Sequence, residues 1–98
     1  MEIGQVYTFK LNSGEELVAK VTEVVEGQGY KIQTPVSIAP GQQGMQLIPS
    51  MFTADPDLDV TINTNSVAMF ALTDDSVKMK YIEATTGIKI PEKKILVG

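Results

Sequence analysis

The sequence contains no cysteine, no histidine, no tryptophan and no arginine, so its eight basic residues are all lysines. Without cysteine, neither a disulfide nor a thiolate-bound metal can stabilise the fold. Without histidine there is also no Ser-His-Asp triad and no imidazole zinc site. Without arginine the chain lacks the planar group that grips phosphate or guanine through two hydrogen bonds. We therefore predict no enzymatic activity, no cofactor and no metal.

Long apolar runs are missing as well. No stretch approaches the roughly 20 apolar residues that a membrane span requires, and residues 1–5 lack the basic and apolar regions of a secretory signal. We expect no membrane partner and a cytoplasmic location. The net charge of −4 repels nucleic acid at long range, although a local basic patch can override that repulsion.

What is present is a 98-residue chain with 43% hydrophobic residues, which is enough for one small folded domain. A chain of this length has a small core, and no disulfide is available to reinforce it. Association with further copies is a natural way to bury more apolar area.

Alternating apolar and polar residues predict a β-hairpin at the start of the chain. Residues 6–11 and 16–22 alternate on either side of a turn at Asn12-Ser13-Gly14. The residues expected to face inward are Tyr7, Phe9, Leu11, Leu17, Ala19 and Val21. The residues of the second strand expected to face outward are Glu16, Val18, Lys20 and Thr22.

The same pattern predicts further strands, bounded by turn residues, at residues 30–38, 45–54, 60–63 and 67–72. Proline lacks a backbone N–H, so the strand that contains Pro35 has to lie at a sheet edge or bend there. The last two strands form a hairpin or one bent strand. Asp55, Asp57 and Asp59 resemble the start of a calcium loop, but the required glycine and glutamate are absent further on, so we interpret them as an exposed turn.

After residue 73 the apolar period changes to that of a helix. Thr73 or Asp74 can cap a helix over residues 74–86, and Gly87 is placed to end it. Its apolar face consists of Val77, Tyr81 and Ala84. Residues 88–98, which include Pro91, are expected to add as an extended segment to a sheet edge.

Three segments resemble Sm and Sm-like proteins. Residues 9–21, FKLNSGEELVAKV, resemble the first motif of that family, and residues 62–67, INTNSV, look like a weakened second motif. Residues 81–88, YIEATTGI, resemble the corresponding part of small Sm-like proteins encoded by marine tailed phages. If a phage encodes the chain, the cytoplasm in question is that of the host.

The resemblance implies a mainly β fold: a five-stranded, strongly bent antiparallel Sm-like barrel over residues 1–73, with one short helix and an extended tail at 74–98 packed on the same domain. Edge strands of such barrels pair between copies, which closes a cyclic homo-oligomer. The residues we expect in or near that contact are Met45, Leu47, Met51, Val67, Met69 and Leu72.

In ring-forming relatives, RNA lies around the pore, where an Asn of the first motif and an Arg-Gly of the second hold a base. Here Pro35 takes the place of that Asn, and Asn63 and Thr64 replace the Arg-Gly. The candidates that remain for weak binding of single-stranded RNA are Gln33, Asn63 and Asn65. The alternative is that residues 33–35 and residues 63–65 simply form turns.

Two functions therefore stay open. The first is a ring-forming scaffold that binds single-stranded RNA weakly at its pore. The second is a structural ring that binds a protein partner and has lost the RNA role, which the acidic composition and the absence of arginine favour. Lys89, Lys93 and Lys94 can contact phosphate, but a lysine-rich tail is more often simply solvated.

Overall fold

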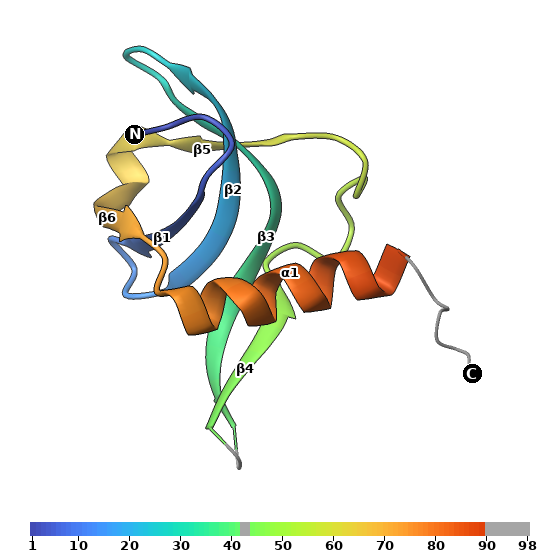
Figure 1. Cartoon of the computed structure of the whole chain (residues 1–98). Helices are drawn as coiled ribbons and strands as arrows, with labels where there is room; N and C mark the ends of the chain where they lie inside the picture. The colour runs from blue at the N-terminus through green and yellow to red at the C-terminus, as the bar shows by residue number, and fades with distance from the viewer. Residues whose placement is uncertain (42–43, 90–98) are drawn as a thin grey trace.

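The computed structural model describes residues 1–41 and 44–89, which form a strongly bent antiparallel sheet and one helix (Figure 1). The elements in chain order are β1 (Val6–Leu11), β2 (Glu16–Val25), β3 (Gly29–Gly41), β4 (Gly44–Pro49), β5 (Val60–Asn63), a 3-10 turn (Thr64–Ser66), β6 (Val67–Leu72) and α1 (Asp75–Lys89). The predicted class, a small mainly β barrel-like fold with a short helix after the sheet, is confirmed. No helix in the described part of the chain is long and apolar enough to cross a membrane.

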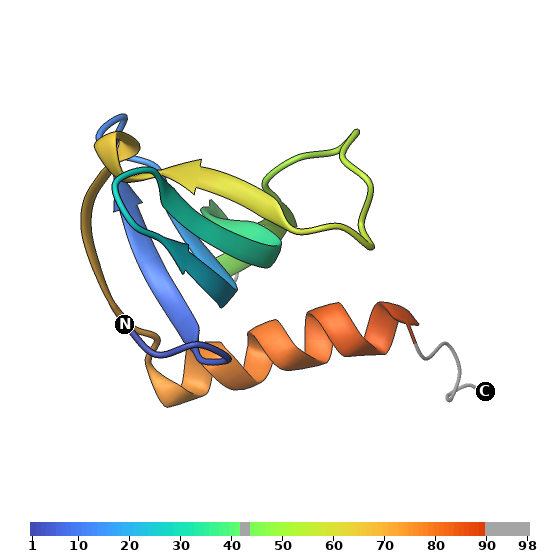
Figure 2. The ribbon, with the colours of Figure 1, turned by 90° about the horizontal axis from the view of Figure 1, so that it is seen from above.

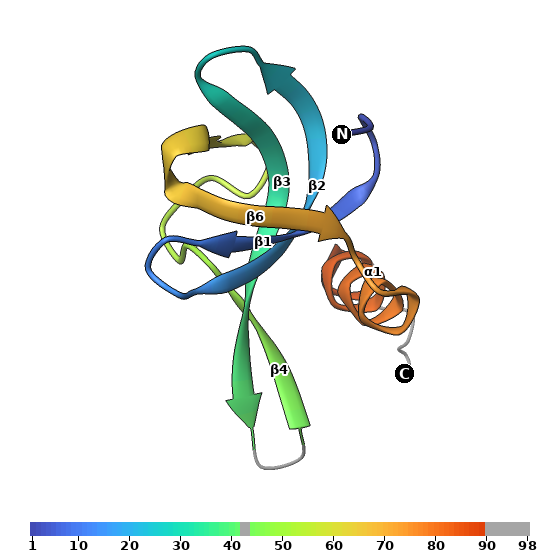
Figure 3. The same cartoon turned by 90° about the vertical axis from the view of Figure 1, so that its left-hand side faces the viewer.

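The strands follow the order β4-β3-β2-β1-β6, and β5 also pairs with β3. Figure 3 shows the long strand β3 crossing the molecule behind β1 and β6. Its first half pairs with β5 and its second half pairs with β4. β4 and β6 therefore end up at opposite edges of the sheet.

The predicted strand over residues 45–54 is wrong beyond Pro49. β4 ends there, opposite Val36, and pairing with β3 resumes only at Val60, opposite Ile32. Residues 50–59 leave the sheet between these two points, and β5 corresponds to the strand predicted separately over residues 60–63. Of the two alternatives for the last two strands, a hairpin or one bent strand, the hairpin is wrong, because β5 pairs with β3 whereas β6 pairs with β1.

The strand that contains Pro35 was predicted either to lie at a sheet edge or to bend there. β3 does bend beside Pro35. Thr34 has a positive φ of 48°, which is uncommon for a residue with a side chain. The register with β2 shifts at the same place, between Val18 and Lys20. These features form a β-bulge, and a bulge accommodates a proline and increases the local bend of a strand.

The interior of the bent sheet holds the first hydrophobic cluster. It contains Phe9 and Val21, both fully buried, and is joined from the rim by Leu11 and Tyr30. The aromatic rings of Phe9 and Tyr30 lie 5.8 Å apart, a distance typical of packed aromatic pairs. The complete cluster is Tyr7, Phe9, Leu17, Ala19, Val21 and Ile32. All residues predicted to face inward are in it or packed against it.

A second cluster lies on the opposite face of the sheet, between the strands and α1. Figure 2 shows the helix running along this face. It consists of Val6, Val18, Val36 and Tyr81. Val18 does point away from the barrel interior, but it is only 1% exposed, because the helix covers it. Val18 was predicted to face outward, and it is instead part of a second core between the sheet and the helix.

The helix begins as predicted and ends later than predicted. The Asp74 carboxylate accepts a hydrogen bond of 3.1 Å from the Ser76 N–H. Hydrogen bonds from the Ser76 hydroxyl and from backbone N–H groups hold the pKa of Asp74 below its usual value. The prediction that Gly87 ends the helix is wrong, since α1 continues to Lys89; one glycine inside a helix costs only about 1 kcal/mol. The extended segment predicted for residues 88–98 is wrong for Ile88 and Lys89, which belong to α1; residues 90–98 lie outside the described residues.

Candidate functional site

Strand β6 forms an edge of the sheet without any polar side chain. Its sequence is VAMFAL, and among the described strands it pairs only with β1 (Figure 3). Met69 is 65% exposed and Leu72 is 61% exposed. Natural sheets usually protect an edge with charge, proline or a covering segment. β6 has no charge and no proline, which makes it a candidate surface for another strand.

The opposite edge, β4, belongs to a hairpin that extends beyond the barrel (Figure 1). It is also mostly apolar, with Met45 and Ile48 at the surface, 47% and 40% exposed. One apolar edge thus stands at each end of the same sheet. Such a pair allows one copy of the chain to present β4 to β6 of the next.

Of the six residues predicted for the contact between copies, four are exposed in the single chain: Met45, Met51, Met69 and Leu72. Leu47 and Val67 are half-buried against the chain's own two clusters. Met51 lies in the segment after β4 rather than in a strand. Ile48 and Phe70 are also exposed on these edge strands, and neither is among the six residues predicted for the contact.

Phe70 lies opposite the buried Phe9 because the alternation of β6 is interrupted. The register with β1 shifts between Lys10 and Leu11, which changes the face on which the following residues lie. The Phe70 ring lies 6.1 Å from that of Tyr7 and 6.0 Å from that of Tyr30. It partly covers the open side of the barrel interior and remains 45% exposed.

Amide side chains gather at the end of the barrel where the β2–β3 turn meets the 3-10 turn. The Thr64 N–H donates a hydrogen bond of 3.1 Å to the Gln28 carbonyl oxygen. The Asn12 side chain donates one of 2.5 Å to the carbonyl oxygen of Asn65. Asn63, opposite Gly29 in the sheet, completes this group. We call Asn12, Gln28, Asn63 and Asn65, all exposed, the amide end.

The structure does not bring Gln33 to the amide end. Gln33 lies four residues further along β3 than Gly29, about 13 Å at the rise of a strand. It lines a separate cavity with Lys20 and Lys78 near the helix. Asn63 and Asn65 are therefore neighbours, and Gln33 is not part of their group. Gln28 and Asn12 were not among the predicted site residues. Each lies in a glycine-containing turn, and the two turns could have indicated that these side chains are exposed.

The amide end depends on a close approach between strands at Gly29. A Cβ atom at this position would collide with the Ile62 carbonyl oxygen and lie 3.1 Å from the Cα of Asn63. We expect Gly29→Ala to lower the free energy of unfolding by about 3 kcal/mol, because β5 would have to move away from β3. Urea denaturation measures the change.

Gly27→Ala is the matched control for that substitution. Gly27 lies in the same turn with open space around its Cβ position, and only its φ of +77° opposes a side chain. We expect a loss of about 1 kcal/mol. Equal losses at the two positions would contradict the close approach of β5 to β3.

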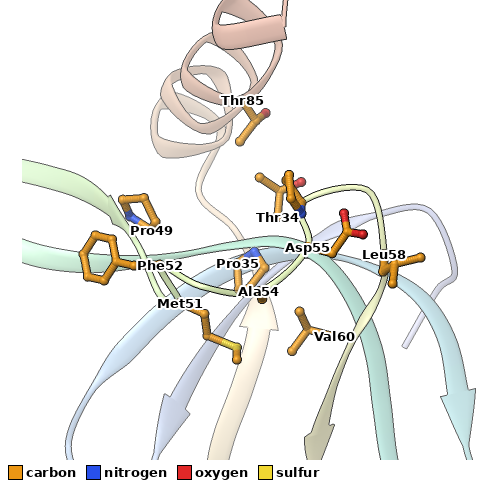
Figure 4. A pocket seen from close by; sticks show the side chains of 11 residues that line it. Thr34, Pro35, Pro49, Met51, Phe52, Ala54, Asp55, Leu58, Val60 and Thr85 are labelled. Atoms are coloured by element: carbon orange, nitrogen blue, oxygen red, sulfur yellow. The ribbon is translucent and has the colours of Figure 1, made fainter.

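A further feature is an apolar cavity of about 320 Å³ beside residues 50–59 (Figure 4). Near it, Asp55 and Asp59 act as local hydrogen-bond acceptors: the Asp55 carboxylate accepts the Asp57 N–H at 2.9 Å, and that of Asp59 accepts the Thr22 hydroxyl at 2.7 Å. The acidic turn is exposed, as predicted. Nowhere in residues 1–41 and 44–89 do three His, Cys, Asp or Glu side chains come together in a way that could hold a metal ion.

The described residues thus present two apolar sheet edges, one uncharged amide end and one apolar cavity. Asn and Gln can read base edges by hydrogen bonds, whereas exposed apolar edges suit a protein strand. In a comparison with known proteins, neither a family model nor a curated protein matches this chain.

Proposed function

We propose that the chain is the subunit of an Sm-like homo-oligomeric ring that acts as a cytoplasmic scaffold. In this arrangement β6 of one copy pairs with β4 of the next. The observation that carries the proposal is the exposed strand VAMFAL at the sheet edge. An unprotected apolar edge is an aggregation hazard in a monomer, and regular pairing with another copy removes that hazard.

The positions of the two edges support a closed assembly. β4 and β6 lie at opposite ends of the strand order, so the contact joins two different surfaces of the same chain. A contact of this kind repeats from copy to copy, and it closes into a ring when the rotation between neighbours divides a full turn. The resemblance of residues 9–21 and 62–67 to Sm proteins also supports a closed ring.

Light scattering coupled to size exclusion tests this assembly. We expect a mass that is a multiple of the 10.6 kDa subunit, and native mass spectrometry then gives the number of copies. A stable monomer at high concentration would overturn the proposal.

The amide end makes single-stranded RNA a ligand to be tested on that ring. It offers base-reading amides without a cation among its members, so each site is expected to be weak, and a ring would repeat it. We expect uridine- or adenine-rich strands to bind at low salt, and Asn63→Ala to weaken binding about tenfold, as one lost base contact does.

Gln33→Ala is the control for this titration, because Gln33 lies apart from the amide end. It should leave RNA affinity unchanged. No binding by the unmodified protein would favour the alternative ring, which has a protein partner and no RNA role.

A further inference from the structure

The apolar cavity lies between residues 50–59, the bend of β3 and the second half of α1 (Figure 4). Pro35 comes from the bend, Val60 from the start of β5 and Thr85 from the helix. Figure 1 shows the segment 50–59 and the second half of α1 extending past β3 in the same direction. The cavity is thus bounded by the helix on one side and by the segment between β4 and β5 on the other.

Large apolar side chains surround this cavity without being buried. Phe52 is 81% exposed, Leu58 is 64% exposed and Met51 is 51% exposed, and all three line it. Together they form an apolar patch around a concave site, which is typical of a surface that binds another apolar group. The pairing of β4 with β6 does not account for this patch, because it lies in the segment that leaves the sheet.

We propose that Ile95, Leu96 and Val97, in the segment that follows α1, dock into this cavity within the same chain. Thr85 already lines the cavity, and α1 runs only four residues further, to Lys89, a rise of about 6 Å. Residues 90–94 span up to about 17 Å when extended. The connection is therefore long enough to return the apolar triplet to the cavity.

Charge complementarity favours the same occupant. Lys93 and Lys94 directly precede the apolar triplet. Asp55 lines the cavity, and the adjacent turn carries Asp57 and Asp59. Within the described residues the one ion pair joins Lys31 to Glu23, so these three carboxylates have no lysine partner there. A docked triplet would place two lysines beside three carboxylates.

The docking would fasten the second half of α1 to the segment between β4 and β5. It does not depend on the proposed ring, since both the cavity and the occupant belong to one chain. The proposed ring and the proposed docking can therefore be tested independently, and one can be wrong while the other is right.

Cysteine cross-linking tests the proposal in the full chain, which has no cysteine of its own. We expect the double variant Leu58→Cys/Leu96→Cys to form an intramolecular disulfide under mild oxidation. The matched control is Met79→Cys/Leu96→Cys, because Met79 and Leu58 are both 64% exposed. Met79 lies ten residues before Lys89 on α1, about 15 Å along the helix, so the segment can reach it as well.

The Leu58 pair should cross-link about tenfold faster than the Met79 pair, because docking raises the effective concentration of the two thiols. Adding Lys93→Glu and Lys94→Glu should slow the Leu58 pair, whereas Lys→Arg at both positions should not. Equal rates for the two pairs would overturn the proposal. A Leu58 disulfide that joins two chains, seen as a dimer band without reductant, would also overturn it and would assign the cavity to a neighbouring copy.

Discussion

Replacing Met69 by glutamate is expected to dissociate the proposed assembly. Met69 is 65% exposed at the apolar edge, so the single chain should fold normally with the substitution. Pairing with another copy would bury this side chain. Loss of that burial, together with desolvation of a carboxylate, should weaken each contact by about 3 kcal/mol, or about 100-fold in Kd. Light scattering should then show the 10.6 kDa subunit.

Met79→Glu is the control for this experiment. Met79 is 64% exposed on α1 and belongs to neither edge strand, and the substitution adds the same charge. It should leave the mass of the assembly unchanged. An assembly that survives Met69→Glu, or that both substitutions disrupt equally, would show that β6 is not the contact.

Replacing Tyr81 by alanine is expected to cause a large loss of stability in the single chain. Tyr81 is 4% exposed and is the helix residue in the second cluster, where it packs with Val18 and Val36. Removing a buried aromatic ring typically costs about 4 kcal/mol. We expect urea denaturation to show a loss of that size and α1 to separate from the sheet.

The Tyr81 hydroxyl also forms hydrogen bonds with two backbone groups at the β-bulge. It donates a hydrogen bond of 2.9 Å to the Gln33 carbonyl oxygen and accepts one of 3.3 Å from the Lys20 N–H. The shift of register beside Lys20 interrupts the ladder at this point. Tyr81→Phe keeps the ring and leaves both backbone groups short of a partner, so we expect a loss of about 2 kcal/mol. A change below about 0.5 kcal/mol would show that water replaces the hydroxyl without cost.

The same hydroxyl gives stability a dependence on alkaline pH. Burial raises the pKa of Tyr81 above its ordinary value of 10.0, and the hydrogen bond from Lys20 partly opposes that rise. A raised pKa means that the folded state holds the proton more tightly than the unfolded state does. Its contribution is therefore complete below pH 10 and declines as the pH rises further. Tyr81→Phe should show a smaller loss of stability than the unmodified protein between pH 9 and pH 11.

The first hairpin could be predicted residue by residue because it is a local structure. Alternation over residues 6–22 and a glycine turn set both its register and its inward face. The helix start at Asp74 was predictable for the same reason, since a cap acts within one turn. The candidate site was predictable only in part: Asn63 and Asn65 do lie together, but the grouping with Gln33 depended on an alignment to family motifs.

The sequence by itself determined which residues are apolar, how they alternate and where turns are favoured, and hence the mainly β class with a helix after the sheet. The tertiary structure alone decided that α1 covers Val18, that residues 50–59 leave the sheet between β4 and β5, and that β5 pairs with β3 whereas β6 pairs with β1. The reason is physical. Alternation tells which side of a strand a residue occupies, but burial on that side depends on which distant segment packs there.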